Sequence, residues 1–117
     1  SINSNVTVPN GAFLAVVAKG SITFGSGVAS AQGWFVAESI NILCKDIVAP
    51  LGTCDKTDVQ FAGEGSFVGW TGISLSRDMG TGNNTVPAEK FTYRPDMLLN
   101  IPTPMKVYTK KFSPFVP

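Results

Sequence analysis

The feature that most constrains this chain is an internal repeat of a glycine, one variable residue, a phenylalanine and a branched aliphatic residue. The pattern occurs at residues 11–14, 33–36 and 65–68, and a small or apolar run follows each copy. The second interval is longer than the first and contains both cysteines of the protein. Sequence repeats of this kind are typical of stacked supersecondary units. We therefore expect one β coil per repeat, with an inserted loop in the third.

Short apolar runs separated by glycine favour strands over helices. Charged residues make up 15% of the chain, which contains 12 glycines and 8 prolines, whereas an average soluble domain is roughly one quarter charged. Residues 13–18 are apolar without alternation, as in a strand that is buried on both faces of a parallel sheet. One helical turn is expected at residues 95–99, because Pro95 suits a first helical position. The sequence predicts an all-β fold, a short right-handed parallel β-helix of about three to four coils.

The length of 117 residues predicts a single β-helical domain spanning residues 1–117. Residues 1–76 carry the repeat and are expected to form the coils. Residues 77–117 begin with a polar loop and end in a proline-rich tail that is too apolar for a free linker, so we expect an extended strap packed on the coils. No apolar run approaches the ~20 residues of a membrane span, and the first residues do not resemble a signal peptide. We expect a mature or excised piece without membrane insertion.

The two cysteines bracket the extra length between the second and third repeats. Nine residues, Pro50 and Gly52 among them, separate Cys44 from Cys54, and a turn within them would allow a disulfide. Closing so short a loop would stabilise the fold by roughly 2 to 3 kcal/mol. A disulfide implies an oxidising compartment, and the alternative is two free buried thiols in a cytosolic protein. We expect the disulfide, and with it an extracellular or cell-surface location.

Two arginine and aspartate pairs flank the polar loop. Arg77 is followed directly by Asp78, and Arg94 and Asp96 lie on either side of a proline. An arginine can bind a carboxylate through two parallel hydrogen bonds. We expect these four residues to form a structural latch that holds the strap against the last coil.

Two tryptophans and the polar loop are the candidate partner-binding residues. Trp34 and Trp70 occupy similar places in successive repeats. If both side chains point outward, they form an aromatic platform for a sugar or a protein, and if they point inward, they fill the core. Asn83 and Asn84 lie in the polar loop and complete the candidate surface.

No constellation of residues points to catalysis. The chain has no histidine, so the usual base of nucleophilic catalysis is missing. Glu38, Glu64 and Asp78 are the acids that stacking could bring together, and a structural role is the simpler interpretation for each. Asp78, Asn83 and Asn84 could offer oxygen ligands to calcium, but the spacing of a calcium loop is absent. We expect no enzymatic activity, no cofactor and no catalytic, cofactor-binding or metal-binding residues.

Several strings of the sequence together resemble a known family. They are Gly-Trp-Phe-Val-Ala-Glu-Ser-Ile at 33–40, Gly-Glu-Gly-Ser-Phe-Val-Gly-Trp at 63–70, Leu-Ser-Arg-Asp at 75–78, Pro-Ala-Glu at 87–89, Phe-Thr-Tyr-Arg-Pro-Asp-Met-Leu-Leu at 91–99 and a closing proline. Nearly the whole chain is similar to a small β-helical module at the C-terminal end of bacterial cell-surface and pilus-associated proteins of the PilX-like, pilus-assembly kind. The resemblance implies a surface location more than an activity.

Together these features predict a non-enzymatic structural or adhesive module of a bacterial cell-surface or pilus-associated protein. Its partner would be another protein or the remainder of a larger surface polypeptide. The net charge of +1 is not gathered into a basic face, so nucleic acid is not expected as a partner. Two alternatives remain: a glycan-binding module that uses the tryptophans and the polar loop, and a small jelly-roll subunit of a virion or extracellular filament.

Overall fold

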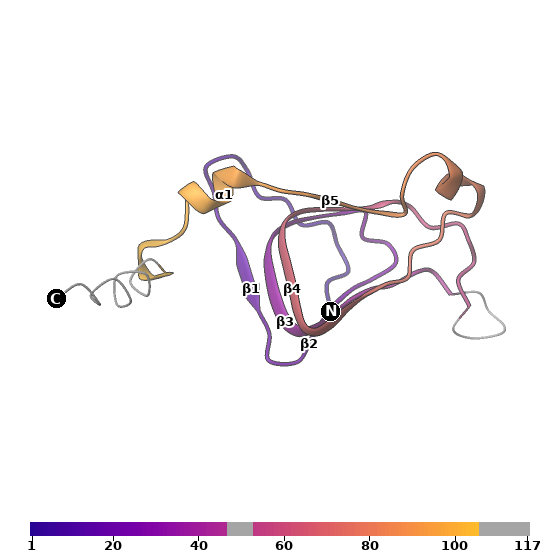
Figure 1. Ribbon diagram of the computed structural model, residues 1–117, viewed down its shortest axis with the longest axis horizontal. Coiled ribbons are helices and arrows are strands. Elements are labelled where there is room, and N and C mark those ends of the chain that lie inside the picture. Colours follow the sequence, from indigo (N-terminus) through magenta and orange to yellow (C-terminus); the bar gives the residue numbers. More distant parts are fainter. Residues whose placement is uncertain (47–52, 106–117) are drawn as a thin grey trace.

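The computed structural model describes residues 1–46 and 53–105, which are built around one sheet of five strands. Two long strands, β3 (Ser30–Ile42) and β4 (Phe61–Leu75), pair along most of their length. The short strands β1 (Ala15–Val17) and β2 (Ser21–Phe24) both pair with β3, and β5 (Glu89–Thr92) pairs with the start of β4. These four pairings are all parallel, and Figure 1 shows β3 and β4 following the same bend.

This architecture corrects the prediction of an all-β, right-handed parallel β-helix of three to four coils. The structure is a small domain of α/β type with one mostly parallel sheet and few helices, the 3-10 helix η1 (Gly80–Asn84) and the helix α1 (Pro95–Leu99). The prediction is wrong because it ends a short strand at each glycine. β3 and β4 instead continue for 13 and 15 residues, so residues 1–76 do not divide into one coil per repeat.

The second and third copies of the repeat lie opposite each other on β3 and β4. Gly33 pairs with Gly65 and Phe35 with Phe67, and the two phenyl rings stack with centroids 5.1 Å apart. Gly65 has a φ of 121°, and a Cβ added there would collide with the carbonyl oxygen of Gly33. These glycines therefore let the strands approach closely within the sheet rather than ending them.

The first copy of the repeat does not join this row. Val16, and not Phe13, lies opposite Phe35. The ring of Phe13 instead packs edge-on against Trp34, with the centroids 5.0 Å apart. The phenylalanines of the second and third copies therefore stack in register, and the phenylalanine of the first copy does not join them.

Alternate residues of β2, β3 and β4 form the apolar core. Phe24, Phe35 and Phe61 are fully buried, as are Ile40 and Ile42. The ring of Phe24 lies 5.1 Å from that of Phe35 and 5.2 Å from that of Phe61. Burying aromatic rings in contact supplies more stabilisation than area alone predicts. The core thus joins all three strands through aromatic contacts.

The predicted helical turn at residues 95–99 is confirmed as α1, which has its proline in the first turn. Met97 is the buried residue of this helix, while Leu99 is 81% exposed. Most of the predicted C-terminal strap falls on residues 106–117, which lie outside the described residues.

Candidate functional site

Among the described residues, the strand β4 has a neighbour on both edges only over its first four residues. There, Phe61–Glu64 lie between β3 and β5. The Phe61 amide donates to the Ala88 carbonyl on the β5 side, and the Ala62 amide donates to the Ala29 carbonyl on the β3 side. Amides alternate between the two edges of a strand in this way. In the described ranges no strand pairs with the outer edge of residues 66–75, so this segment presents free backbone donors and acceptors.

An apolar hollow of about 240 Å³ opens next to this free edge. It is lined by Gly65, Phe67, Ile73, Leu75 and Phe91. Ile73, Leu75 and Phe91 are between 41% and 52% exposed, which is unusual for side chains that line an apolar core. The core is thus open to solvent at this end of the sheet.

The free edge lacks the features that usually prevent strand pairing. Residues 65–75 contain no charged residue and no proline, whereas exposed edge strands of monomeric proteins commonly carry one or the other. The strand does contain one irregularity, because the register with β3 shifts between Ala37 and Ser39. Trp70 lies at that shift. We define the uncharged edge at residues 66–75, together with the apolar hollow, as the open edge of β4.

The structure does not bring the two tryptophans together into one platform. Trp34 is half-buried and lies opposite Ser66. Trp70 is 76% exposed, so it is accessible to a partner. The similar positions of the two tryptophans in the repeat therefore do not place them side by side.

A second hollow, of about 260 Å³, is polar and lies on the same part of the sheet. Its lining residues are Ser39, Asn41, Thr71, Gly72, Ile73 and Ser74. The Ser21 and Ser39 hydroxyls lie 2.6 Å apart, and the Asn41 amide donates to the Thr23 hydroxyl over 3.5 Å. Neighbouring parallel strands thus carry hydroxyl and amide groups side by side. We call the residues that line this second hollow the polar shelf, and Trp70 directly precedes one of them, Thr71.

The predicted disulfide between Cys44 and Cys54 is confirmed, with the two Cα atoms 5.6 Å apart. The buried carboxylate of Asp58 holds the base of the loop that the disulfide closes. It accepts hydrogen bonds from the amides of Lys45 and Asp78, each over 2.8 Å. The disulfide and Asp58 together fix the connection between β3 and β4.

Arg77 is a buried structural residue, only 6% exposed. Its Nη2 donates to the carbonyls of Gly25 and Val28 over 2.8 and 2.7 Å, and its Nη1 donates to the Val59 carbonyl over 3.1 Å. Burial lowers the pKa of its guanidinium. Its own amide donates to the Glu89 carboxylate over 2.7 Å. Among the described residues its guanidinium forms no ion pair with a carboxylate, so it binds main-chain carbonyls instead of the expected acid.

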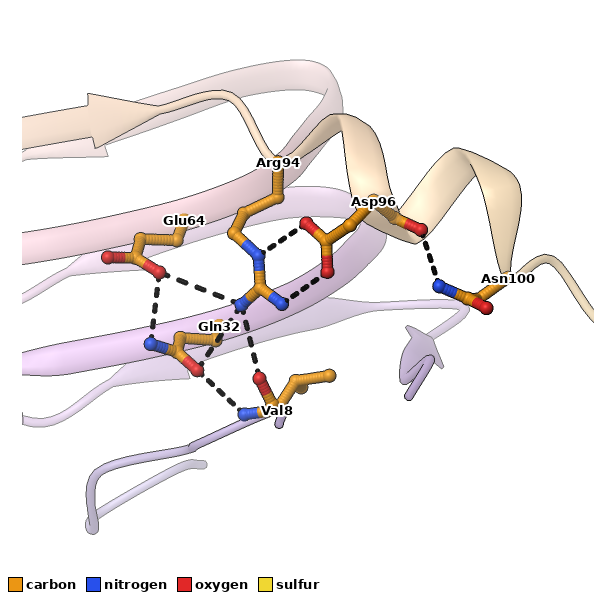
Figure 2. A network of polar contacts seen from close by, with 6 residues as sticks. All are labelled: Val8, Gln32, Glu64, Arg94, Asp96 and Asn100. Carbon is orange, nitrogen blue, oxygen red and sulfur yellow. Dashed lines mark hydrogen bonds and ion pairs between the residues drawn. The ribbon is translucent and has the colours of Figure 1, made fainter. Parts of the chain in front are cut away.

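Arg94 lies at the centre of a polar network that joins distant parts of the chain (Figure 2). Its Nε and Nη2 donate to the two carboxylate oxygens of Asp96 over 2.8 and 2.7 Å. Its Nη1 donates to the Val8 carbonyl over 3.1 Å and lies 3.7 Å from a Glu64 oxygen. Gln32 completes the network, donating to Glu64 over 2.9 Å and accepting from the Val8 amide over 2.7 Å. The segment after β5 is thereby tied to the N-terminal segment and to both long strands.

The ion pair changes the acidity of both partners in the direction that favours their charged forms. The hydrogen bonds from Arg94 lower the pKa of Asp96, and the same contacts raise the pKa of Arg94. The latch function of this pair stays a prediction, and exposed ion pairs of this kind typically contribute little to stability.

The polar loop after β4 is organised by Asp78. One of its carboxylate oxygens accepts hydrogen bonds from the Gly80 amide over 2.8 Å and from the Asn83 side chain over 2.9 Å. Asn84 is exposed. Within residues 1–46 and 53–105 no group of three histidine, cysteine or acidic side chains is arranged to hold a metal ion.

The open edge of β4 is the feature that the sequence prediction missed. Residues 65–75 carry no charge and no proline, but residues 20–37 carry none either, so this composition does not single out the open edge in the sequence. No helix in the described part of the chain is both long and apolar enough to cross a membrane.

Comparisons with models of known families, with curated proteins and with solved structures give no match.

Proposed function

We propose that this protein is a non-enzymatic structural or adhesive module of a bacterial cell-surface or pilus-associated protein. In this proposal it binds another protein, or the remainder of a larger surface polypeptide, through the open edge of β4. The single observation that carries the proposal is this edge, which combines free backbone groups, an apolar hollow and an absence of charge. Exposed apolar patches next to unpaired strand edges are typical of protein-binding surfaces.

The disulfide supports the proposed location outside the cytosol. Disulfides persist in oxidising compartments and are rare in the cytosol. The bond between Cys44 and Cys54 is compatible with an extracellular protein. The resemblance to pilus-associated modules supports the same placement and is part of the proposal.

A surface-retention experiment tests the proposed function. In the cells that produce the protein, Ile73→Lys would place a charge in the apolar hollow, whereas Val86→Lys is the matched control. Ile73 is 41% exposed and Val86 is 47% exposed, but only Ile73 lines the hollow. We expect the cell-bound fraction, measured by immunoblot and by labelling with a membrane-impermeant reagent, to fall at least tenfold for Ile73→Lys alone. Equal retention of both variants, or a wild-type protein that is never cell-bound, would overturn the proposal.

A second candidate function, glycan binding, is favoured by the polar shelf next to Trp70. Sugars bind where hydroxyl and amide side chains lie near an exposed aromatic ring. A glycan array compares wild type with Trp70→Ala and Ser74→Ala. Loss of a wild-type signal in both variants would support glycan binding, and a blank wild-type array would refute it. The jelly-roll alternative has less support, because jelly rolls are antiparallel and the strand pairings described here are parallel.

A further inference from the structure

The strands β1 and β2 show how an edge of this sheet is covered. β1 pairs in parallel with Trp34–Val36 of β3, and β2 pairs in parallel with Ser39–Ile42 of the same strand. One segment of the chain, residues 14–24, therefore covers two successive stretches of β3. Figure 1 shows this segment next to the bend that β3 and β4 share.

Residues 66–75 of β4 lie opposite the part of β3 that residues 14–24 cover. The pairing of the two long strands places Trp34–Val36 opposite Ser66–Val68, and Ser39–Ile42 opposite Gly72–Leu75. After β5 the chain continues into α1, and up to residue 105 it does not pair along β4. Residues 66–68 and 72–75 of β4 are thus equivalent to the two stretches of β3 that pair with β1 and β2. Among the described residues, no strand pairs with the outer edge of either stretch of β4.

The effect of a covering strand can be seen by comparing the exposure of side chains at paired positions of β3 and β4. Ile40 and Ile42 lie beneath β2, opposite Ile22 and Phe24, and both are fully buried. Their counterparts on β4 are Ile73 and Leu75, which are 41% and 52% exposed. Because the side chains are of similar size and occupy equivalent positions, we attribute the difference to the lack, among the described residues, of a strand beside residues 72–75 of β4. Covering them would remove apolar surface from water and so favour binding.

The chemistry of the edge specifies the segment that would fit it. The edge is uncharged, so the segment must also be uncharged opposite residues 66–68 and 72–75, to avoid burying an unpaired charge. On β2, apolar side chains enter the core while the Ser21 and Thr23 hydroxyls contact polar groups of β3. The same alternation suits β4, where Ile73 and Leu75 face the core and Ser74 lies between them. A basic residue is tolerated at the bend between the two stretches, where the covering segment has Lys19.

We propose that the open edge of β4 accepts an extended segment of a partner protein as an added parallel strand, in the register that β1 and β2 use on β3. The segment is uncharged along both paired stretches, with apolar residues that fill the hollow and polar residues between them. This inference rests on the proposed function, since it names the chemistry of the protein partner. Main-chain hydrogen bonds would supply affinity, and the hollow would supply specificity.

The chain itself provides the probe for a test. A synthetic peptide with the sequence of residues 14–24, capped at both ends, has the pattern that covers β3. We expect it to bind the intact protein and to slow hydrogen exchange of amides in residues 66–75, measured by NMR. A nitroxide on the peptide N-terminus should broaden the resonances near Ser66 if the strand is parallel, and those near Leu75 if it is antiparallel.

Matched variants decide whether the peptide uses the proposed site. Ile73→Lys in the protein, or Ile22→Lys in the peptide, should weaken binding at least tenfold, whereas Val86→Lys in the protein should leave it unchanged. An antiparallel peptide, a peptide bound elsewhere, or no binding at millimolar concentration would each overturn the inference. Self-association of the wild-type protein that protects the same amides without peptide would also overturn it, because the occupant would then be a second copy.

The peptide test and the surface-retention test can fail separately. If Ile73→Lys releases the protein from cells but the peptide does not bind as a parallel strand, the proposed function stands and strand addition is wrong. If the peptide binds as expected but both Ile73→Lys and Val86→Lys remain on cells, the proposed function is wrong, while strand addition at this edge stands.

Discussion

The N-terminal and C-terminal segments of β4, called here its first half (residues 61–64) and its second half (residues 66–75), differ in length and in their surroundings. The first half, Phe61–Glu64, lies between β3 and β5, and Phe61 is fully buried. The second half, residues 66–75, pairs only with β3 within residues 1–46 and 53–105, and its core-facing Ile73 and Leu75 are about half exposed. Both halves carry apolar residues at their core-facing positions. The comparison teaches that burial here depends on whether a second neighbour is present, and not on the strand's own sequence.

Truncating a core side chain in each half tests this comparison most strongly. Phe61→Ala should lower the free energy of unfolding by about 3 to 5 kcal/mol, because it removes a fully buried ring. Ile73→Ala should cost about 1 kcal/mol or less, because the side chain is already 41% exposed. Chemical denaturation followed by circular dichroism measures both. Equal losses would mean that the second half is covered in solution.

Replacing Arg77 should cause the next largest loss of stability, because its side chain binds the turns around the first half of β4. Arg77→Met would leave three main-chain carbonyls without their donor, and it would remove the guanidinium that lies 5.7 Å from the ring centre of Phe61. We expect a loss of about 2 to 4 kcal/mol in the same denaturation experiment. Arg94→Met is the comparison variant and should cost less, because its ion pair is more exposed to water. A larger loss for Arg94→Met would contradict this ranking.

Removing the disulfide should give a smaller and more local effect. The double variant Cys44→Ser with Cys54→Ser should lose roughly 2 to 3 kcal/mol of stability, the value expected for opening a short loop. Hydrogen exchange should speed up around Asp55 and Thr57 and remain unchanged in the second half of β4. Faster exchange throughout residues 66–75 would show that the loop also supports the open edge.

Breaking the pair of Arg94 and Asp96 should cause the smallest loss of stability, and the size of this loss should depend on pH. The pKa of Asp96 is lower in the folded protein than its ordinary value, so the pair stabilises the fold at neutral pH. This contribution is lost as the pH falls below about 4, through the lowered pKa of the folded state. Asp96→Asn should therefore be slightly less stable than wild type at pH 7, and the difference should shrink as the pH is lowered and Asp96 becomes protonated in the folded protein. Asp55, whose pKa is also lowered, is unchanged in this variant and cancels in the difference.

Local chemistry made part of this fold predictable from the sequence. The disulfide follows from two cysteines that bracket an inserted loop, and α1 follows from a proline before an apolar turn. The stacking of Phe35 on Phe67 follows from two copies of one motif on neighbouring strands. Each of these features depends on residues near each other in the sequence or on an exact repeat.

Features that depend on distant partners could not be predicted in the same way. Strand length was underestimated because glycine, which commonly ends a strand, here lies within β3 and β4 at a close backbone approach. The burial of Arg77 depends on carbonyls contributed by Gly25 and Val28, far away in the sequence. The open edge exists because β5 is only four residues long. None of these partners leaves a local pattern in the chain.

The long reach of Arg77 also has a consequence for the order in which the molecule forms. Its side chain binds carbonyls 52 and 49 positions earlier in the chain, so the turn that precedes β3 does not gain these two hydrogen bonds until residue 77 has been synthesised. Parallel strands joined by long connections already fold slowly, because distant segments must meet before any contact stabilises them. We therefore expect nascent chains that end before Arg77 to remain sensitive to protease, and chains that extend past it to become resistant. The contacts of Arg77 with Gly25 and Val28 therefore predict that the N-terminal part of the fold gains its full stability only after residue 77 has been added.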